Sequence, residues 1–214
     1  VGMGRNTISV VTPAHPARCR NGMLDRAMRS AQAQTLLPHE LCVAIDSDGD
    51  GAPATRDRAL RQASGDWVAF LDSDDIFMPH HLEHLLQHAQ DANADYVYSW
   101  YTLLDQNNNL WGDKDPIFPP THFTEPFNPD DPIETTITIL VRRELAQQIG
   151  MRPAEYPGGT NPGVNSGEDR RFTHEAIRLG AKISHLVERT WVWHHHGQNT
   201  SGKATKGDGG MVAS

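Results

Sequence analysis

The sequence predicts an α/β fold, built on an open, mostly parallel sheet with helices on both faces. Throughout the first hundred residues, short apolar runs alternate with segments whose apolar residues recur at helical spacing. Three of these apolar runs end on polar residues, as strands do where a parallel sheet opens onto a ligand crevice. The length of 214 residues, of which 37% are hydrophobic, suits one domain with a sizeable core and long polar loops.

The elements of the first half follow from local pattern. Four β-branched or aromatic runs have the length of buried strands: residues 7–12, 41–45, 67–71 and 96–101. The first is expected to run into a loop, because Pro13 and Pro16 follow it. Three segments place apolar side chains on one helical face: residues 22–34, 54–63 and 79–89, the last with Pro79 as its first residue. Asn107-Asn108-Asn109 is expected to be the turn of a hairpin.

The alternation weakens after about residue 105, where proline, glycine and aspartate become frequent. Two further strands and two further helices are expected there: strands at 134–141 and 183–193, and helices at 142–149 and 168–179. Gly180 ends the second of these helices. The remaining segments are expected to be a loop at 112–132, a mobile loop at 153–167 and a flexible tail at 201–214.

Composition excludes several classes of protein. The chain has 19 basic and 27 acidic residues, a net charge of −8, so binding to a nucleic-acid backbone is not expected. No apolar run approaches the roughly 20 residues of a membrane span, and no signal peptide opens the chain. Cys19 and Cys42 show no metal-ligand spacing, so we expect free thiols in a reducing, cytoplasmic compartment.

The most specific motif is the acidic turn Asp72-Ser73-Asp74-Asp75, which directly follows the third predicted strand. Neighbouring carboxylates repel one another unless a cation or a hydrogen-bonded ligand compensates them. Carboxylate oxygens suit Mg²⁺ or Mn²⁺, ions that commonly link protein carboxylates to a ligand's phosphates. A solvated turn that caps the next helix is the alternative, but the place of the motif at a strand end favours a ligand site.

Two further acidic segments admit more than one interpretation. Asp46-Ser47-Asp48-Gly49-Asp50-Gly51 spells the start of a calcium loop with Asp57 at its twelfth position, but it follows a strand and lacks the final glutamate. We therefore favour Asp46 as a strand-end carboxylate directed at a ligand. Gly167-Glu168-Asp169 opens a predicted helix, where acids favour the helix dipole and where a carboxylate could equally serve as a general base.

Histidines are numerous, at 12, but their spacing does not define a complete metal site. His194 and His196 would face one side of the last strand and His195 the other, so the three cannot all bind one ion. A single metal ligand is one interpretation of this segment, and surface histidines are the interpretation that the segment alone favours. Four histidines at helical spacing are expected to form a solvated face: His80, His81, His84 and His88. The sequence contains no phosphate-binding glycine loop, dinucleotide fingerprint or nucleophile elbow.

Taken in order, these segments resemble the family 2 glycosyltransferases, whose fold is the Rossmann-like GT-A fold, over residues 6 to 201. The matching segments are Val10-Val11-Thr12-Pro13, residues 29–35, Thr55-Arg56-Asp57-Arg58-Ala59-Leu60, residues 63–75, residues 141–145, Gly167-Glu168-Asp169 and residues 196–201. The resemblance implies transfer of a sugar from a nucleotide diphosphate donor, typically a UDP-sugar, with inversion at the anomeric carbon and with Mn²⁺ or Mg²⁺ as cofactor. The resemblance does not identify the acceptor.

The resemblance also implies roles for individual residues. Those expected to bind the nucleotide are Thr12, Pro13, Asp46, Arg56, Asp72 and Ser73. Asp74 and His196 are expected to hold the metal, and Asp169 to act as general base. A single domain is expected over residues 1–200, with a nucleotide-sugar-binding half at 6–105 and an acceptor-binding half at 106–200. A nucleotidyltransferase and a calcium-stabilised carbohydrate-binding module are the alternatives.

Overall fold

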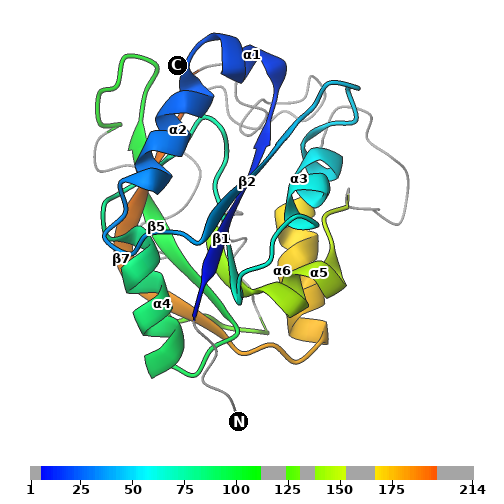
Figure 1. Ribbon diagram of the computed structural model, residues 1–214. Coiled ribbons are helices and arrows are strands. Elements are labelled where there is room, and N and C mark those ends of the chain that lie inside the picture. The colour runs from blue at the N-terminus through cyan, green and yellow to red at the C-terminus, as the bar shows by residue number, and fades with distance from the viewer. Residues whose placement is uncertain (1–5, 112–123, 131–137, 153–166, 197–214) are drawn as a thin grey trace, which may run out of the picture.

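The computed structural model describes residues 6–111, 124–130, 138–152 and 167–196 (Figure 1). The strands are β1 (Ile8–Ala14), β2 (Glu40–Ile45), β3 (Trp67–Phe70), β4 (Ile76–Phe77), β5 (Tyr96–Leu104), β6 (Ile139–Arg142) and β7 (Ile183–His194). The helices are α1 (Pro16–Arg20), α2 (Met23–Gln32), α3 (Ala52–Leu60), α4 (His81–Asp91), α5 (Arg143–Ile149) and α6 (Glu168–Arg178). None of the helices in this described part of the chain has the length and apolar character needed to cross a membrane.

All of these strands belong to one sheet in the order β2-β1-β3-β6-β5-β7-β4. β1 pairs in parallel with both β2 and β3, and β5 pairs in parallel with β7. β6 lies antiparallel between β3 and β5, and β4 lies antiparallel against β7. The predicted mostly parallel sheet is therefore confirmed, with β6 and β4 running against the other strands.

Apolar side chains cover both faces of the sheet. Within β1 the side chains alternate, so Val10 packs toward α2 and α4 while Val11 packs toward α3, α5 and α6. Figure 1 shows these two groups of helices on opposite sides of the sheet. Every residue of β1 is buried, as expected for a strand covered on both faces. The carboxyl end of β1 is therefore held by packing on both faces of the sheet.

The segment after β1 differs from the prediction of a loop. β1 continues through Pro13 to Ala14, because its pairing with β2 extends to Ile45. Pro16 then starts the short helix α1, and the Nδ1 atom of His15 accepts a hydrogen bond from the N–H of Ala17 at 3.1 Å. A helix of this length is too short to show an apolar period, so the sequence pattern did not reveal it.

Smaller differences concern the edges of elements. α4 begins at His81 rather than at Pro79, and the two-residue strand β4 was not predicted. The hairpin turn at 107–109 is confirmed, since Leu104 pairs with Leu110 across it. The predicted tail, most of the two predicted loops and residues 134–137 lie outside the described residues. The predicted acceptor half supplies β6 and β7, so both halves of the chain build the same sheet.

The face of α4 that carries histidines is only partly solvated, so the prediction was wrong for His81. His80 and His84 are exposed, but His81 is fully buried. Its ring stacks on Phe77 at 4.0 Å, and its Nδ1 atom lies 2.7 Å from the hydroxyl of Thr190 on β7. Burial lowers the pKa of His81 to about 3, so the folded protein holds this ring neutral.

We expect His81 to make the fold sensitive to acid. The unfolded chain protonates this ring near pH 6.5 while the folded chain does not, so the unfolded state binds more protons below that pH. The contribution of neutral His81 to the free energy of unfolding is fully present above pH 6.5. It falls by up to about 1.4 kcal/mol for each pH unit below that value. Urea unfolding of the wild type and of His81→Gln, at pH 7 and pH 5.5, should show a smaller pH dependence in the variant. Equal pH dependence in the two proteins would contradict this account.

Candidate functional site

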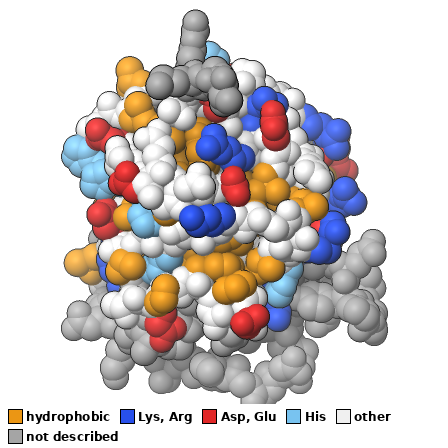
Figure 2. All heavy atoms as spheres, turned by 90° about the horizontal axis from the view of Figure 1, so that it is seen from below, with side chains coloured by type: hydrophobic (Ala, Val, Ile, Leu, Met, Phe, Trp, Pro, Cys, Tyr) orange, Lys and Arg blue, Asp and Glu red, His pale blue; other side chains and the backbone are white. Residues whose placement is uncertain are grey.

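The carboxyl ends of β1, β2 and β3 lie side by side, as the sequence predicted for three polar strand ends. The N–H of Asp46 donates to the carbonyl of Ala14 at 2.8 Å, which joins the end of β2 to the end of β1. The N–H of Leu71 donates to the carbonyl of Val11 at 3.0 Å, which places the acidic turn beside Thr12. Figure 2 views the opposite end of the molecule, where β1 begins, and there acidic, basic and hydrophobic side chains are intermixed.

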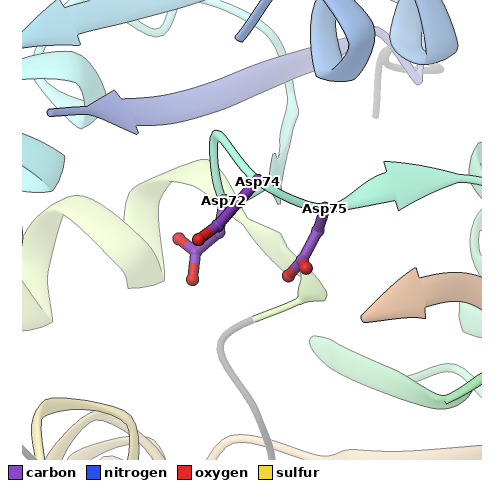
Figure 3. A group of neighbouring side chains, drawn as sticks. All are labelled: Asp72, Asp74 and Asp75. Carbon is purple, nitrogen blue, oxygen red and sulfur yellow. The ribbon is translucent and has the colours of Figure 1, made fainter. Parts of the chain in front are cut away.

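The acidic turn connects β3 to β4 and brings three carboxylates together. The ligand oxygens of Asp72, Asp74 and Asp75 all lie within 4.8 Å of one another, and Figure 3 shows the side chains on the same side of the turn. In the described part of the chain, this is the one such cluster of three acidic, histidine or cysteine groups. The turn is tight, since the N–H of Asp75 donates to the carbonyl of Asp72 at 3.1 Å.

The three carboxylates of this turn have different environments. Asp75 is buried and accepts a hydrogen bond from the N–H of His194 on β7 at 3.1 Å. Burial, together with repulsion from Asp74 and Asp72, raises the pKa of Asp75 well above its usual value. Burial would also raise the pKa of Asp74, but its hydrogen bond with His196 and the charge of Arg18 lower it overall. The surroundings therefore favour the charged form of Asp74 and the protonated form of Asp75. The hydrogen bond of Asp75 joins the turn to β7.

Three basic side chains lie close to Asp74. The Nε2 atom of His196 lies 3.0 Å from its Oδ2 atom, and Arg18 on α1 lies 3.3 Å from the same oxygen. Arg26 on α2 donates to the carbonyl oxygen of Asp74 at 3.3 Å. The structure therefore brings together Asp74 and His196, which were both predicted, with two arginines that the sequence analysis missed. Arg18 lies on the helix that directly follows β1, whereas Arg26 lies on the next helix, so only Arg18 had a position in the sequence that pointed to the site.

Arg56 occupies the centre of the site. Its side chain on α3 is 3% exposed, and it pairs with Asp72 at 2.5 Å and with Glu168 on α6. Burial opposes its charge, but the surrounding carboxylates Asp72, Asp169 and Asp74 raise the pKa of Arg56 overall. It is therefore a permanent buried cation between the acidic turn and the start of α6. The contact with Glu168 was not predicted.

The other predicted residues lie around this centre. Thr12 and Pro13 are buried in β1, and Ser73 is buried within the turn. The Thr12 hydroxyl has no hydrogen-bond partner among the described residues, so a buried donor is left for a ligand. Asp169 is partly buried in the first turn of α6, and its carbonyl accepts a hydrogen bond from the Thr173 hydroxyl at 3.1 Å.

The calcium-loop alternative finds no support in the geometry. The Asp46 carboxylate accepts hydrogen bonds from the N–H groups of Asp50 at 2.9 Å and Gly51 at 3.1 Å. Asp57 lies on α3, where its carboxylate contacts Arg61 at 2.8 Å and the N–H of Met151 at 3.0 Å. The first and last carboxylates of the supposed loop therefore have other partners, and Asp46 instead shapes the turn after β2.

The acidic turn has the chemistry of a divalent cation site. Asp72 and Asp74 offer partly buried carboxylate oxygens, the ligands that Mg²⁺ and Mn²⁺ prefer. His196 adds an imidazole nitrogen, which suits Mn²⁺. Since Asp74 is held ionised, the donor set fits such an ion.

Comparisons with known proteins match the part of the chain that carries the acidic turn. Residues 48–150, which contain Arg56 and the acidic turn, match the model of the family described as Glycosyl transferase family 2. The chain is 32% identical over 108 residues to the putative teichuronic acid biosynthesis glycosyltransferase TuaG of Bacillus subtilis, covering 49% of this chain and 40% of that protein. It is 27% identical over 124 residues to the UDP-Glc:alpha-D-GlcNAc-diphosphoundecaprenol beta-1,3-glucosyltransferase WfgD of Escherichia coli, covering 47% of this chain and 48% of that protein.

Solved structures share the fold. The structure of S. aureus TarS 1–349 in complex with UDP-GlcNAc superposes with a TM-score of 0.69 at 19% identity, covering 93% of this chain and 62% of that one. The complex of the same protein with UDP gives a TM-score of 0.63 at 18% identity, covering 88% of this chain and 60% of that one. The predicted GT-A fold is therefore confirmed. The chain spans less than half the length of TuaG and of WfgD. Over residues 48–150 the chain is therefore similar to glycosyl transferase family 2, and it shares its fold with TarS.

Proposed function

We propose that this chain is a metal-dependent, inverting glycosyltransferase that moves a sugar from a UDP-sugar to an acceptor hydroxyl. The proposal depends mainly on one observation. A single buried arginine, Arg56, contacts both the acidic turn at Asp72 and the start of α6 at Glu168, next to Asp169. Groups suited to hold a diphosphate and a group suited to take a proton therefore meet at the carboxyl end of the sheet.

The donor side of the proposal uses the first three strand ends. Thr12, Pro13 and Asp46 would line the base pocket, and Asp72 with Ser73 would contact the ribose. TarS structures contain UDP and UDP-GlcNAc, and the name of WfgD specifies a UDP-Glc donor, which supports uridine as the base. Residues 6–105 would thus bind the donor and residues 106–200 the acceptor.

Asp74, Asp72 and His196 are the residues that would hold Mn²⁺ or Mg²⁺. When bound, such an ion neutralises the negative charge that develops on a diphosphate leaving group. Arg18 and Arg26 lie beside Asp74 and would add positive charge where the phosphates lie. These side chains hold the leaving group in one orientation, which lowers the entropic part of the barrier.

Asp169 is the proposed general base. Its carboxylate would accept the proton of the acceptor hydroxyl as that oxygen forms its bond to the anomeric carbon. The bond from the anomeric carbon to the diphosphate oxygen breaks in the same displacement, and the leaving group departs as the nucleoside diphosphate. A single displacement inverts the anomeric carbon and requires one base and no enzyme nucleophile.

Calorimetric titration of UDP, GDP and CDP into the protein, with and without Mn²⁺, tests the donor half. We expect UDP to bind most tightly and its affinity to depend on Mn²⁺. Tighter binding of GDP or CDP would still support a glycosyltransferase, but with a nucleobase other than uracil in the donor. Failure of all three nucleotides to bind, in protein shown to be folded by circular dichroism, would overturn the proposed function.

A further inference from the structure

We propose that Glu168 is a positioning residue that acts through Arg56 and transmits occupancy of the donor site to the catalytic carboxylate of Asp169. This inference rests on the proposed function, in which Asp72 contacts the donor and Asp169 takes the proton. Glu168 is not assigned contact with substrate. Its role is to hold the first turn of α6 against the acidic turn.

The side chain of Arg56 connects the acidic turn to the start of α6. Arg56 presents separate nitrogens to its two partners, Nη2 to Asp72 and Nη1 to Glu168. These partners lie on the β3–β4 turn and on α6, far apart in the chain, so the guanidinium is the link between two elements. A planar guanidinium fixes the directions of its donors, which a flexible ammonium does not.

The contact between Arg56 and Glu168 is buried. Arg56 is 3% exposed and the Glu168 side chain is 9% exposed, so solvent screens their attraction weakly. The Arg56 Nε atom and the Glu168 Oε2 atom also lack hydrogen-bond partners among the described residues. Unsatisfied buried polar atoms are costly, and a site that accepts this cost is better explained by function than by stability.

Asp169 is tied to the same group. It follows Glu168 directly in the first turn of α6, and it is one of the charges that stabilise protonated Arg56. The helix is held at this point from other directions as well. Arg171 donates to the carbonyl of Gly150, and the Thr173 hydroxyl lies 3.1 Å from the Tyr96 hydroxyl on β5. A change in how Asp72 holds Arg56 would therefore act on Glu168 and, through the adjoining backbone, on Asp169.

Hydrogen exchange of the peptide that spans residues 167–178 tests the link, with UDP and Mn²⁺ as the probe. In the wild type we expect saturating UDP and Mn²⁺ to slow exchange in this peptide by at least about threefold.

Glu168→Gln removes the charge but keeps the shape and leaves Arg56 paired with Asp72. In this variant we expect UDP affinity within about threefold of the wild type and no ligand-dependent slowing. Arg56→Lys cannot reach both partners with fixed directions and should lose the slowing as well.

Glu175→Gln is the matched control. It removes a carboxylate from the same helix but away from the site, where Glu175 pairs with Arg178 at a distance of 2.8 Å. This variant should behave as the wild type. A merely structural role for Glu168 would speed exchange equally with and without UDP. That result, or full ligand-dependent slowing in Glu168→Gln, would overturn the proposal. If Glu168→Gln does not fold, Glu168→Asp replaces it, with partial slowing expected. Absence of UDP binding to the wild type would instead remove the proposed function itself.

Discussion

Asp169→Asn is expected to lower kcat for sugar transfer by about 10²- to 10⁴-fold, the usual contribution of a general base. An amide has the same shape as the carboxylate but cannot take the proton of the acceptor hydroxyl. The UDP affinity should stay within a few fold of the wild type, because Asp169 is assigned no contact with the donor. The midpoint of thermal unfolding should change little, since the side chain is only partly buried.

The measurement is steady-state transfer from the UDP-sugar that donor screening identifies, together with UDP calorimetry on the same preparations. Asp25→Asn is a matched control, because Asp25 is also an aspartate in the first turn of a helix but is exposed on α2. It removes the same charge from a helix N-terminus without touching α6. A kcat for Asp169→Asn within threefold of the wild type would reject Asp169 as the base.

Asp74→Asn is expected to abolish the Mn²⁺ dependence of UDP binding and to weaken binding in the presence of Mn²⁺ by about 100-fold or more. That loss corresponds to roughly 2.7 kcal/mol of binding free energy. The reason is the loss of a charged oxygen that the surroundings hold ionised, beside His196 at 3.0 Å and Arg18 at 3.3 Å. An amide oxygen is a weaker ligand for a hard divalent cation.

Calorimetry with and without Mn²⁺ measures this effect, and thermal unfolding checks that the fold survives the loss of Asp74's partners. Asp48→Asn is the matched control, since it removes an exposed carboxylate from the acidic segment after β2. Its UDP binding should match that of the wild type. Retained Mn²⁺ dependence in Asp74→Asn, or its loss in Asp48→Asn, would show that the metal site lies elsewhere.

Local pattern in the sequence was sufficient for most of the fold and for the acidic part of the site. Val10 and Val11 alternate across β1 with the period of 2 residues of a strand, and the apolar stripe of α4 follows the period of 3.6 residues of a helix. Both periods can be read from a short segment of sequence. The acidic turn was recognisable because its residues are adjacent in the chain and follow a strand. Parallel strands then had to bring Thr12, Asp46 and Asp72 to one edge of the sheet.

The tertiary structure alone decided the antiparallel insertion of β6, the burial of His81, and the contacts that Arg18, Arg26 and Glu168 make in the site. Arg56 and Glu168 are more than a hundred residues apart, and nothing in the segment around either one specifies the other. Local periodicity reports which face of an element is apolar, but it does not report which charged side chains meet once the elements pack. Those pairings depend on the order of strands in the sheet and on which helices share a face, and both are properties of the whole chain.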